Sequence, residues 1–106
     1  MARVLINLPK AIRRGEPFEV RLLIAHPMES GQRRDPVGAI IPRDIIHHFT
    51  CTLNGALVIE AELFPAISAN PFLSFTARAE ESGELVCTWV DDHGAEGREV
   101  VGVTVA

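Results

Sequence analysis

The sequence has no long run of apolar residues. No apolar segment approaches the ~20 residues that a membrane-spanning helix needs, so no membrane span is predicted. The opening segment MARVLINLPKAIRRG also lacks the features of a signal peptide, because its apolar part is short and no small-residue cleavage site follows. By themselves these absences predict a cytoplasmic protein, or one that is exported by way of another chain.

Basic residues are also few. The chain has a single lysine, Lys10, and its formal net charge is -4, with an isoelectric point near 5.5. The arginines are scattered, apart from the pairs at 13–14 and 33–34. A nucleic-acid backbone is bound by a clustered excess of lysine and arginine, so a nucleic-acid partner is not expected.

The motifs of most catalytic and metal-binding sites are missing as well. Neither Cys51 nor Cys87 belongs to a CxxC pair, which argues against a zinc ribbon or a thioredoxin-like site. There is no GxSxG motif, no glycine-rich phosphate loop and no serine, histidine and aspartate set at a meaningful spacing. The paired acids at 80–81 and 91–92 flank predicted turns, where solvated carboxylates are expected. None of these catalytic classes is therefore predicted from motifs in the sequence.

What the chain does contain is the composition of one globular domain, residues 1–106. It is 47% hydrophobic and 23% charged, with no low-complexity segment. A chain of this length can bury ~65% of its unfolded surface without a disulfide. Cys51 and Cys87 alternate with large apolar residues, as buried and inert cysteines do. A disulfide between them remains an alternative if their strands face each other across a sandwich, but a packed pair of free thiols is favoured.

Hydrophobic periodicity is mostly two, which is typical of β-strands. FEVRLLIA and ELVCTWV alternate clearly, and HHFTCTLNGALVIEAEL predicts a hairpin whose turn is Asn54-Gly55. With ARVLIN, FLSFTARA and EVVGVTV the sequence predicts about seven strands separated by glycine- and proline-rich turns. This pattern indicates an all-β fold, an immunoglobulin-like antiparallel β-sandwich. The one helical candidate, IPRDIIHHF, could equally lead straight into a strand.

The four histidines raise the possibility of a metal centre. Together with a cysteine they match the inventory of superoxide reductases, iron proteins that also have an immunoglobulin-like fold. Two spacings argue against this class. His47 and His48 are adjacent, so in an extended strand they point to opposite faces, and a turn separates Cys87 from His93. We therefore expect no metal and no cofactor, and interpret the histidines, His26 included, as polar surface or turn residues.

Two loops could bind a partner or ligand. In AHPMESGQRRDPVG, Arg33 and Arg34 could hold a small oxyanion through bidentate hydrogen bonds. The same loop carries Glu29 and Asp35, so its charges cancel, and pairing within the loop or with a neighbour is favoured. The second loop, in ELFPAISANPFLSF, is a nine-residue connector that is unusually apolar. Such a connector either packs under its own domain or forms a patch for a partner, and both alternatives stay open.

Several long blocks together resemble one family. HPMESGQRRD (26–35), IPRDII (41–46), CTLNG (51–55) and LFPAISANPFLSF (63–75) occur in order and run nearly the length of the chain. They are similar to SoxZ, the small subunit of the SoxYZ sulfur carrier of the sulfur-oxidising (Sox) pathway. Cys51 lies inside one of these blocks, whereas Cys87 is not part of the pattern.

The resemblance implies a non-catalytic role. In such carriers SoxY holds the sulfur intermediate on a cysteine of a mobile arm, and SoxZ is its immunoglobulin-like partner. The pair visits SoxAX, SoxB and SoxCD in turn during thiosulfate oxidation. This chain ends VVGVTVA, without the GGCGG-like motif of the arm, so we expect it to be the partner subunit. The resemblance also implies a periplasmic location reached by export together with SoxY, in place of the cytoplasm.

A binding surface follows from these two loops. We expect apolar side chains of fixed shape and arginines to act as interface anchors. The predicted partner-binding residues are Met28, Arg33, Arg34, Phe64, Pro65, Ile67, Pro71 and Phe72. An exposed apolar patch also makes a homodimer of the isolated chain plausible. The rival functions are a mononuclear iron redox protein of the superoxide reductase type and a stand-alone oxyanion-binding module at the arginine pair.

Overall fold

The protein is an antiparallel β-sandwich in a computed structural model that describes residues 4–65, 67 and 69–106. Its strands are β1 (Val4–Asn7), β2 (Pro17–Ile24), β3 (Ile46–Leu53), β4 (Ala56–Glu62), β5 (Phe72–Arg78), β6 (Gly83–Asp91) and β7 (Glu96–Val103). The segment that could have been helical is extended and leads into β3. Within the described ranges no helix is long and apolar enough to cross a membrane.

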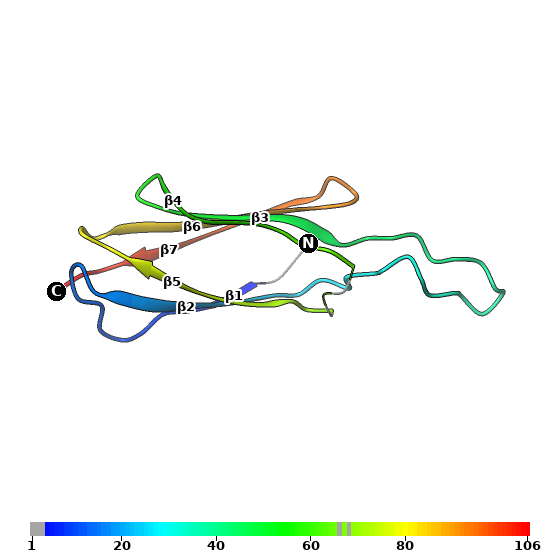
Figure 1. The fold of residues 1–106 in the computed structure, drawn as a ribbon, viewed down its shortest axis with the longest axis horizontal. Coiled ribbons are helices and arrows are strands. Elements are labelled where there is room, and N and C mark those ends of the chain that lie inside the picture. Colours follow the sequence, from blue (N-terminus) through cyan, green and yellow to red (C-terminus); the bar gives the residue numbers. More distant parts are fainter. Residues whose placement is uncertain (1–3, 66, 68) are drawn as a thin grey trace.

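The seven strands form two sheets that face each other (Figure 1). One sheet has the order β1-β2-β5 and the other the order β4-β3-β6-β7, with every strand pair antiparallel. The predicted all-β immunoglobulin-like sandwich is confirmed. Successive residues of a strand point to opposite sides of its sheet, so alternating apolar residues give each sheet one apolar face. The two sheets pack together because this buries both apolar faces.

The core lies between the sheets and is built from alternating positions. β2 shows the pattern most clearly, with every second residue from Phe18 to Ile24 buried and the residues between them exposed. β3 and β6 contribute their inward residues in the same way, among them Phe49, Cys51, Leu85, Cys87 and Trp89. The core is therefore continuous from the first sheet to the second.

Local turn chemistry fixes the hairpin between β3 and β4. Asn54 and Gly55 both have positive φ, 51° and 84°, as a two-residue hairpin turn requires. The Asn54 side chain also accepts a hydrogen bond from the Glu84 amide at 3.0 Å, which ties the turn to β6. The predicted hairpin is confirmed.

The two cysteines are neighbours within one sheet and do not face each other across the sandwich. Cys51 of β3 pairs with Cys87 of β6, and both are fully buried free thiols with their sulfur atoms 3.5 Å apart. Contact with the Cys87 thiol, together with burial, raises the pKa of Cys51 above its ordinary value. Both thiols are free and inaccessible to solvent, so the favoured interpretation of a packed thiol pair is confirmed.

The connection between β2 and β3 projects far beyond the sandwich. We call residues 27–44 the finger, which Figure 1 shows as the long excursion coloured cyan to green. It gives the molecule extents of 58 × 21 × 20 Å. Isolated antiparallel bridges Glu29–Asp44 and Arg34–Ile40 hold its two arms together. At its tip the Asp35 side chain accepts hydrogen bonds from the amides of Val37 and Ala39 at 3.0 and 2.9 Å.

Candidate functional site

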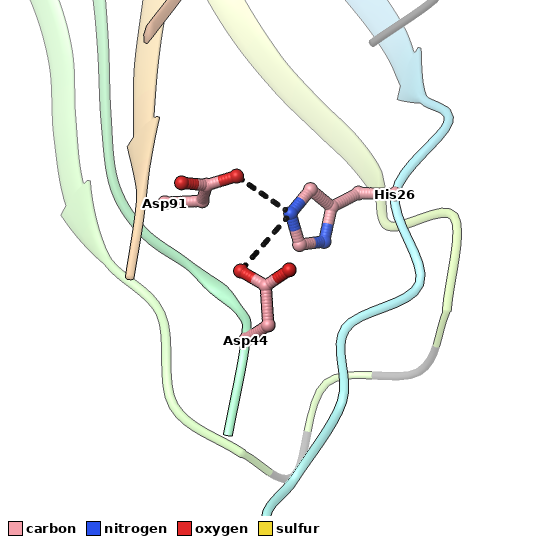
Figure 2. Close-up of side chains that lie close together, drawn as sticks. All are labelled: His26, Asp44 and Asp91. Atoms are coloured by element: carbon pink, nitrogen blue, oxygen red, sulfur yellow. Dashed lines mark hydrogen bonds and ion pairs between the residues drawn. The ribbon is translucent and has the colours of Figure 1, made fainter. Parts of the chain in front are cut away.

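Three side chains from distant parts of the chain meet at the base of the finger. His26 follows β2, Asp44 precedes β3, and Asp91 ends β6. In Figure 2 both carboxylates face the same ring nitrogen of His26. The Nε2 atom of His26 lies 3.1 Å from Asp91 Oδ2 and 3.8 Å from Asp44 Oδ1. We call these residues the His26 cluster.

The backbone fixes the tautomer of His26. The Met28 amide donates a hydrogen bond to Nδ1 at 3.0 Å, and an amide nitrogen can only donate. Nδ1 therefore has a free lone pair, and the neutral ring carries its proton on Nε2, which points at the two carboxylates. The imidazole is 8% exposed, so this arrangement is held away from solvent.

Asp91 accepts hydrogen bonds from both sides. Its Oδ2 receives the His26 N–H, and its Oδ1 receives the amides of His93 and Ala95, each at 2.9 Å. Burial would raise the pKa of Asp91, but these hydrogen bonds outweigh it and hold the pKa below its ordinary value. Asp91 is therefore a structural carboxylate that stays ionised.

Asp44 is less well satisfied. Its Oδ1 is buried and, among the residues that the structure describes, has no hydrogen-bond partner. Its Oδ2 lies 3.4 Å from Nδ1 of His93, which is an exposed side chain. The His26 N–H bonds Asp91, so the Oδ1 atom of Asp44 remains an acceptor without a donor beside the core.

A second acid braces the base of the finger. The guanidinium of Arg43 binds both oxygens of Asp92, at 2.8 and 2.9 Å, and the Ile45 amide donates to the same carboxylate. The hydrogen bond from Arg43 lowers the pKa of Asp92. The expectation of solvated acids at 91–92 is wrong, because their side chains are only 12% and 14% exposed; Asp91 binds His26 and Asp92 binds Arg43 of the finger.

The His26 cluster also corrects the interpretation of His26 as an ordinary turn residue. Its companions come from positions 18 and 65 residues away, and strand packing alone brings them within 4.8 Å of one another. The chemistry of the cluster nevertheless does not suit a metal. Coordination through Nε2 would move the proton to Nδ1, where it would meet the Met28 N–H.

A superoxide-reductase-like iron centre has no counterpart either. In the described part of the chain the His26 cluster is the one group of three or more potential metal ligands, and it holds one histidine and no cysteine. His48 pairs with Glu60 at 3.0 Å, and both cysteines lie in the sheet core. The donor set of four histidines and one cysteine is not assembled.

The predicted residues of the finger have different environments. Met28 is 5% exposed, and its sulfur accepts a hydrogen bond from the Ile46 amide at 3.2 Å. The prediction that its side chain forms a contact surface is corrected, because it packs in the core. Arg33 binds Glu29, with Nε 2.9 Å from Oε2, and Arg34 donates to the Gly38 carbonyl at 2.8 Å. The expected pairing within the loop is confirmed.

Some residues of the apolar connector between β4 and β5 are exposed, and others pack against the domain. Phe64 and Phe72 are 63% and 60% exposed, and Ile67 is 37% exposed. Pro65 is half-buried and Pro71 is buried, so the prolines pack against the domain and offer little surface. Whether the exposed members bind a partner stays a prediction.

Sequence reasoning missed one surface that involves Phe72. On the outer face of the first sheet, Leu5 pairs with Leu23 and Leu23 pairs with Phe72, across all three strands. Their exposed fractions are 65%, 37% and 60%. We call these residues the apolar row. The available signal was Leu23, an apolar residue at a position where β2 otherwise places exposed Glu19 and Arg21.

Comparison with known proteins gives one family and a set of similar folds. The family model of sulphur oxidation protein SoxZ matches residues 6–101, and the comparison with curated proteins found no match. A superoxide reductase (neelaredoxin) from Ignicoccus hospitalis is 18% identical with a TM-score of 0.71, covering 97% of this chain and 80% of that one. The sulfur carrier protein SoxY from Chlorobium limicola f thiosulfatophilum is 16% identical with a TM-score of 0.66, covering 97% and 78%.

The two structural similarities show the sandwich fold alone, since both identities are low. The family match spans nearly the whole chain, including both arms of the finger, the connector and the residues of the His26 cluster. It agrees with the resemblance carried by the sequence blocks, and the chain belongs to the SoxZ family of sulphur oxidation proteins.

Proposed function

We propose that this chain is a non-catalytic subunit of a SoxYZ sulfur carrier that binds SoxY and helps to present its sulfur intermediates to other enzymes. The observation that carries this proposal is the SoxZ family match over residues 6–101. The shared fold with a sulfur carrier protein SoxY is compatible with a carrier built from two similar sandwiches. Transient partners would be SoxAX, SoxB and SoxCD, and the site of action the periplasm, reached together with SoxY.

The state of the reactive groups supports a non-catalytic role. Both thiols are buried and paired with each other in the sheet. His26 is held in one tautomer between a backbone amide and a carboxylate that stays ionised. A general base needs to exchange a proton with a reacting group, and this histidine is already committed to structural hydrogen bonds.

The exposed surfaces support binding of another protein. The apolar row covers all three strands of one sheet, and the finger carries Val37 and Ile40, 89% and 56% exposed, at and beside its tip. Exposed apolar side chains of this size on an ordered scaffold are typical of interaction sites. Two separated surfaces suit a subunit that holds one partner while it meets others.

Co-expression with SoxY tests the proposal directly. We expect the two chains to co-purify and to elute together from a sizing column as one complex. Elution of two separate, folded proteins would contradict the proposed function. Elemental analysis of the purified chain distinguishes the rival class, because an iron redox protein would contain stoichiometric iron.

A further inference from the structure

The tip of the finger, residues 34–40, lies at the end of the long excursion and away from the sandwich (Figure 1). Its surface is apolar, because the segment PVGAII (36–41) has no polar side chain. Val37 and Ile40 are 89% and 56% exposed, and neither belongs to the hydrophobic core nor packs against it. The apolar surface of the tip is therefore available to another molecule.

Asp35 holds this tip in one conformation. The amides of Val37 and Ala39 both donate to its side-chain Oδ1, at 3.0 and 2.9 Å, and the Gly38 amide donates to its carbonyl at 2.9 Å. The Asp35 amide in turn donates to the Ala39 carbonyl at 2.8 Å. Proline has no N–H group, so every amide from residue 35 to residue 39 is paired within the tip. A loop that is ordered before binding loses little conformational entropy when a partner covers it.

The hydrogen bonds of the tip also determine what a partner has to provide. Because the amides are already paired, an apolar pocket can enclose them without leaving a buried donor unsatisfied. The cations are engaged as well, since Arg33 binds Glu29 and Arg34 donates to the Gly38 carbonyl at 2.8 Å. Two arginines and two acids leave residues 29–41 without net charge. The tip therefore fits a concave apolar pocket of a protein better than a phosphate or an anionic lipid surface.

The size of the tip separates a transient partner from a permanent one. A stable protein–protein interface uses about 20–30 residues on each side. The tip has seven residues, and only the two arms of the finger join it to the sandwich. The apolar row, by contrast, lies on a three-stranded sheet whose outer face can add further contacts. The tip therefore suits a partner that binds weakly and leaves, and the sheet suits the permanent subunit.

We propose that the finger tip is the docking point for an enzyme that the carrier meets transiently, and that Val37 and Ile40 enter an apolar pocket of that enzyme. Asp35 is a positioning residue, which holds the tip in the shape that the pocket accepts. SoxY binds elsewhere on the chain. This inference rests on the proposed carrier function, because it needs both a permanent subunit and a visiting enzyme.

Binding and turnover of the intact SoxYZ complex test this inference. Val37→Thr with Ile40→Thr keeps β-branched side chains and removes the apolar surface of the tip. Immobilised SoxYZ is titrated with SoxAX, SoxB and SoxCD in turn. We expect the double variant to co-purify with SoxY as the wild type does, and to bind at least one enzyme about tenfold more weakly.

Thiosulfate-dependent turnover with SoxYZ as the varied reactant provides the second readout. The KM for the double variant should rise while kcat stays unchanged, because the lost contact is equally strong in the ground state and the transition state. Raising the salt concentration should leave the difference from the wild type intact, because the contact is apolar and not ionic.

Three further variants separate contact from order. Asp35→Ala removes the side-chain acceptor of two amides and should weaken enzyme binding. Asp35→Asn keeps a carbonyl oxygen at that position and should bind nearly as the wild type does. Leu57→Thr, at an exposed position of β4 on the other sheet, is the matched control and should change neither binding nor turnover.

Four results would overturn the inference. Wild-type affinity of the Val37 and Ile40 variant for all three enzymes would do so while the carrier function stands. Loss of SoxY from that variant would place the tip in the permanent interface. Equal weakening by both Asp35 variants would contradict the positioning role. Sedimentation with phosphatidylcholine and phosphatidylglycerol vesicles completes the test, since binding that only the wild-type tip supports would identify a membrane contact instead. Separate elution of the wild-type chain and SoxY would sink the carrier function and this inference together.

Discussion

The Met28 amide donates a hydrogen bond to Nδ1 of His26 at 3.0 Å, and this contact determines the chemistry of the base of the finger. It holds the proton of the imidazole on Nε2, where it meets Asp91. Met28 has a positive φ of 48°, and its amide contacts the ring two residues earlier in the chain. A short local turn thus decides that this histidine binds carboxylates and does not suit a metal.

Acidification should destabilise the protein through Asp91 and Asp92. Hydrogen bonds hold the pKa of both below the ordinary value of 3.8, so their contribution to stability is complete above that value and is lost as pH falls through the lowered pKa. Thermal unfolding followed from neutral pH into this range should show a falling Tm. In the Asp91→Asn variant the fall should be smaller; an unchanged pH profile would contradict the assignment.

Met28 should behave as a core residue. Met28→Ala leaves a cavity at a site that is 5% exposed, and we expect it to lower the free energy of unfolding by about 2–5 kcal/mol. Arg33→Ala removes the ion pair with Glu29 in the same finger and should leave the free energy of unfolding nearly unchanged, because solvent screens an exposed pair. Urea denaturation of both variants makes the comparison. Similar, small losses in both would place Met28 at the surface after all.

Two glycines of β7 offer a matched test of packing. A Cβ on Gly97 would lie 2.1 Å from the Trp89 ring, whereas a Cβ on Gly102 would meet nothing within 4 Å. Gly97→Ala should therefore destabilise the protein by about 1–3 kcal/mol and shift Trp89 fluorescence, because the indole has to move. Gly102→Ala should leave both quantities nearly unchanged. Equal effects on unfolding would show that the close approach is absent.

The thiols should resist modification until the protein unfolds. Cys51 and Cys87 are fully buried, and the raised pKa of Cys51 keeps it protonated. We expect no reaction with Ellman's reagent under native conditions and two reactive thiols per chain in denaturant. Fast labelling of the native protein would contradict this picture, and fewer than two thiols after denaturation would indicate a disulfide.

The apolar row should contribute to binding of SoxY. Leu23→Thr with Phe72→Thr keeps β-strand propensity while it removes two adjacent apolar side chains, so we expect a normal fold and weaker co-purification. Leu57→Thr, at an exposed position of β4 on the other sheet, is the control. If the double variant folds and binds SoxY as well as the control does, the row is not the contact surface.

Much of the fold could be predicted from local patterns. Alternation in FEVRLLIA places Phe18, Val20, Leu22 and Ile24 on one face because successive strand residues point to opposite sides. Asn54-Gly55 fixes the hairpin because both residues tolerate positive φ. The blocks from HPMESGQRRD to LFPAISANPFLSF were enough to recognise the SoxZ family. These features depend only on residues that are near each other in the chain, so the sequence alone is sufficient to predict them.

The finger shows where local reasoning stops. Its charges could be counted from the sequence, and the pairing of Arg33 with Glu29 within the loop was expected. The burial of Met28 was not, because a methionine between polar neighbours carries no local sign that its side chain turns back toward β3. The extended, bridged shape of the finger likewise depends on pairing between residues 29 and 44.

Only the tertiary structure determined the His26 cluster and the apolar row. His26, Asp44 and Asp91 meet because β2 and β6 end, and β3 begins, on the same side of the sandwich, and no spacing in the sequence encodes that. Leu5, Leu23 and Phe72 become neighbours through the register of three strands. Strand pairing is set by the summed burial of both sheets, a global quantity. The sequence by itself therefore determined the strands and the family, and the packing of the sheets decided which side chains meet.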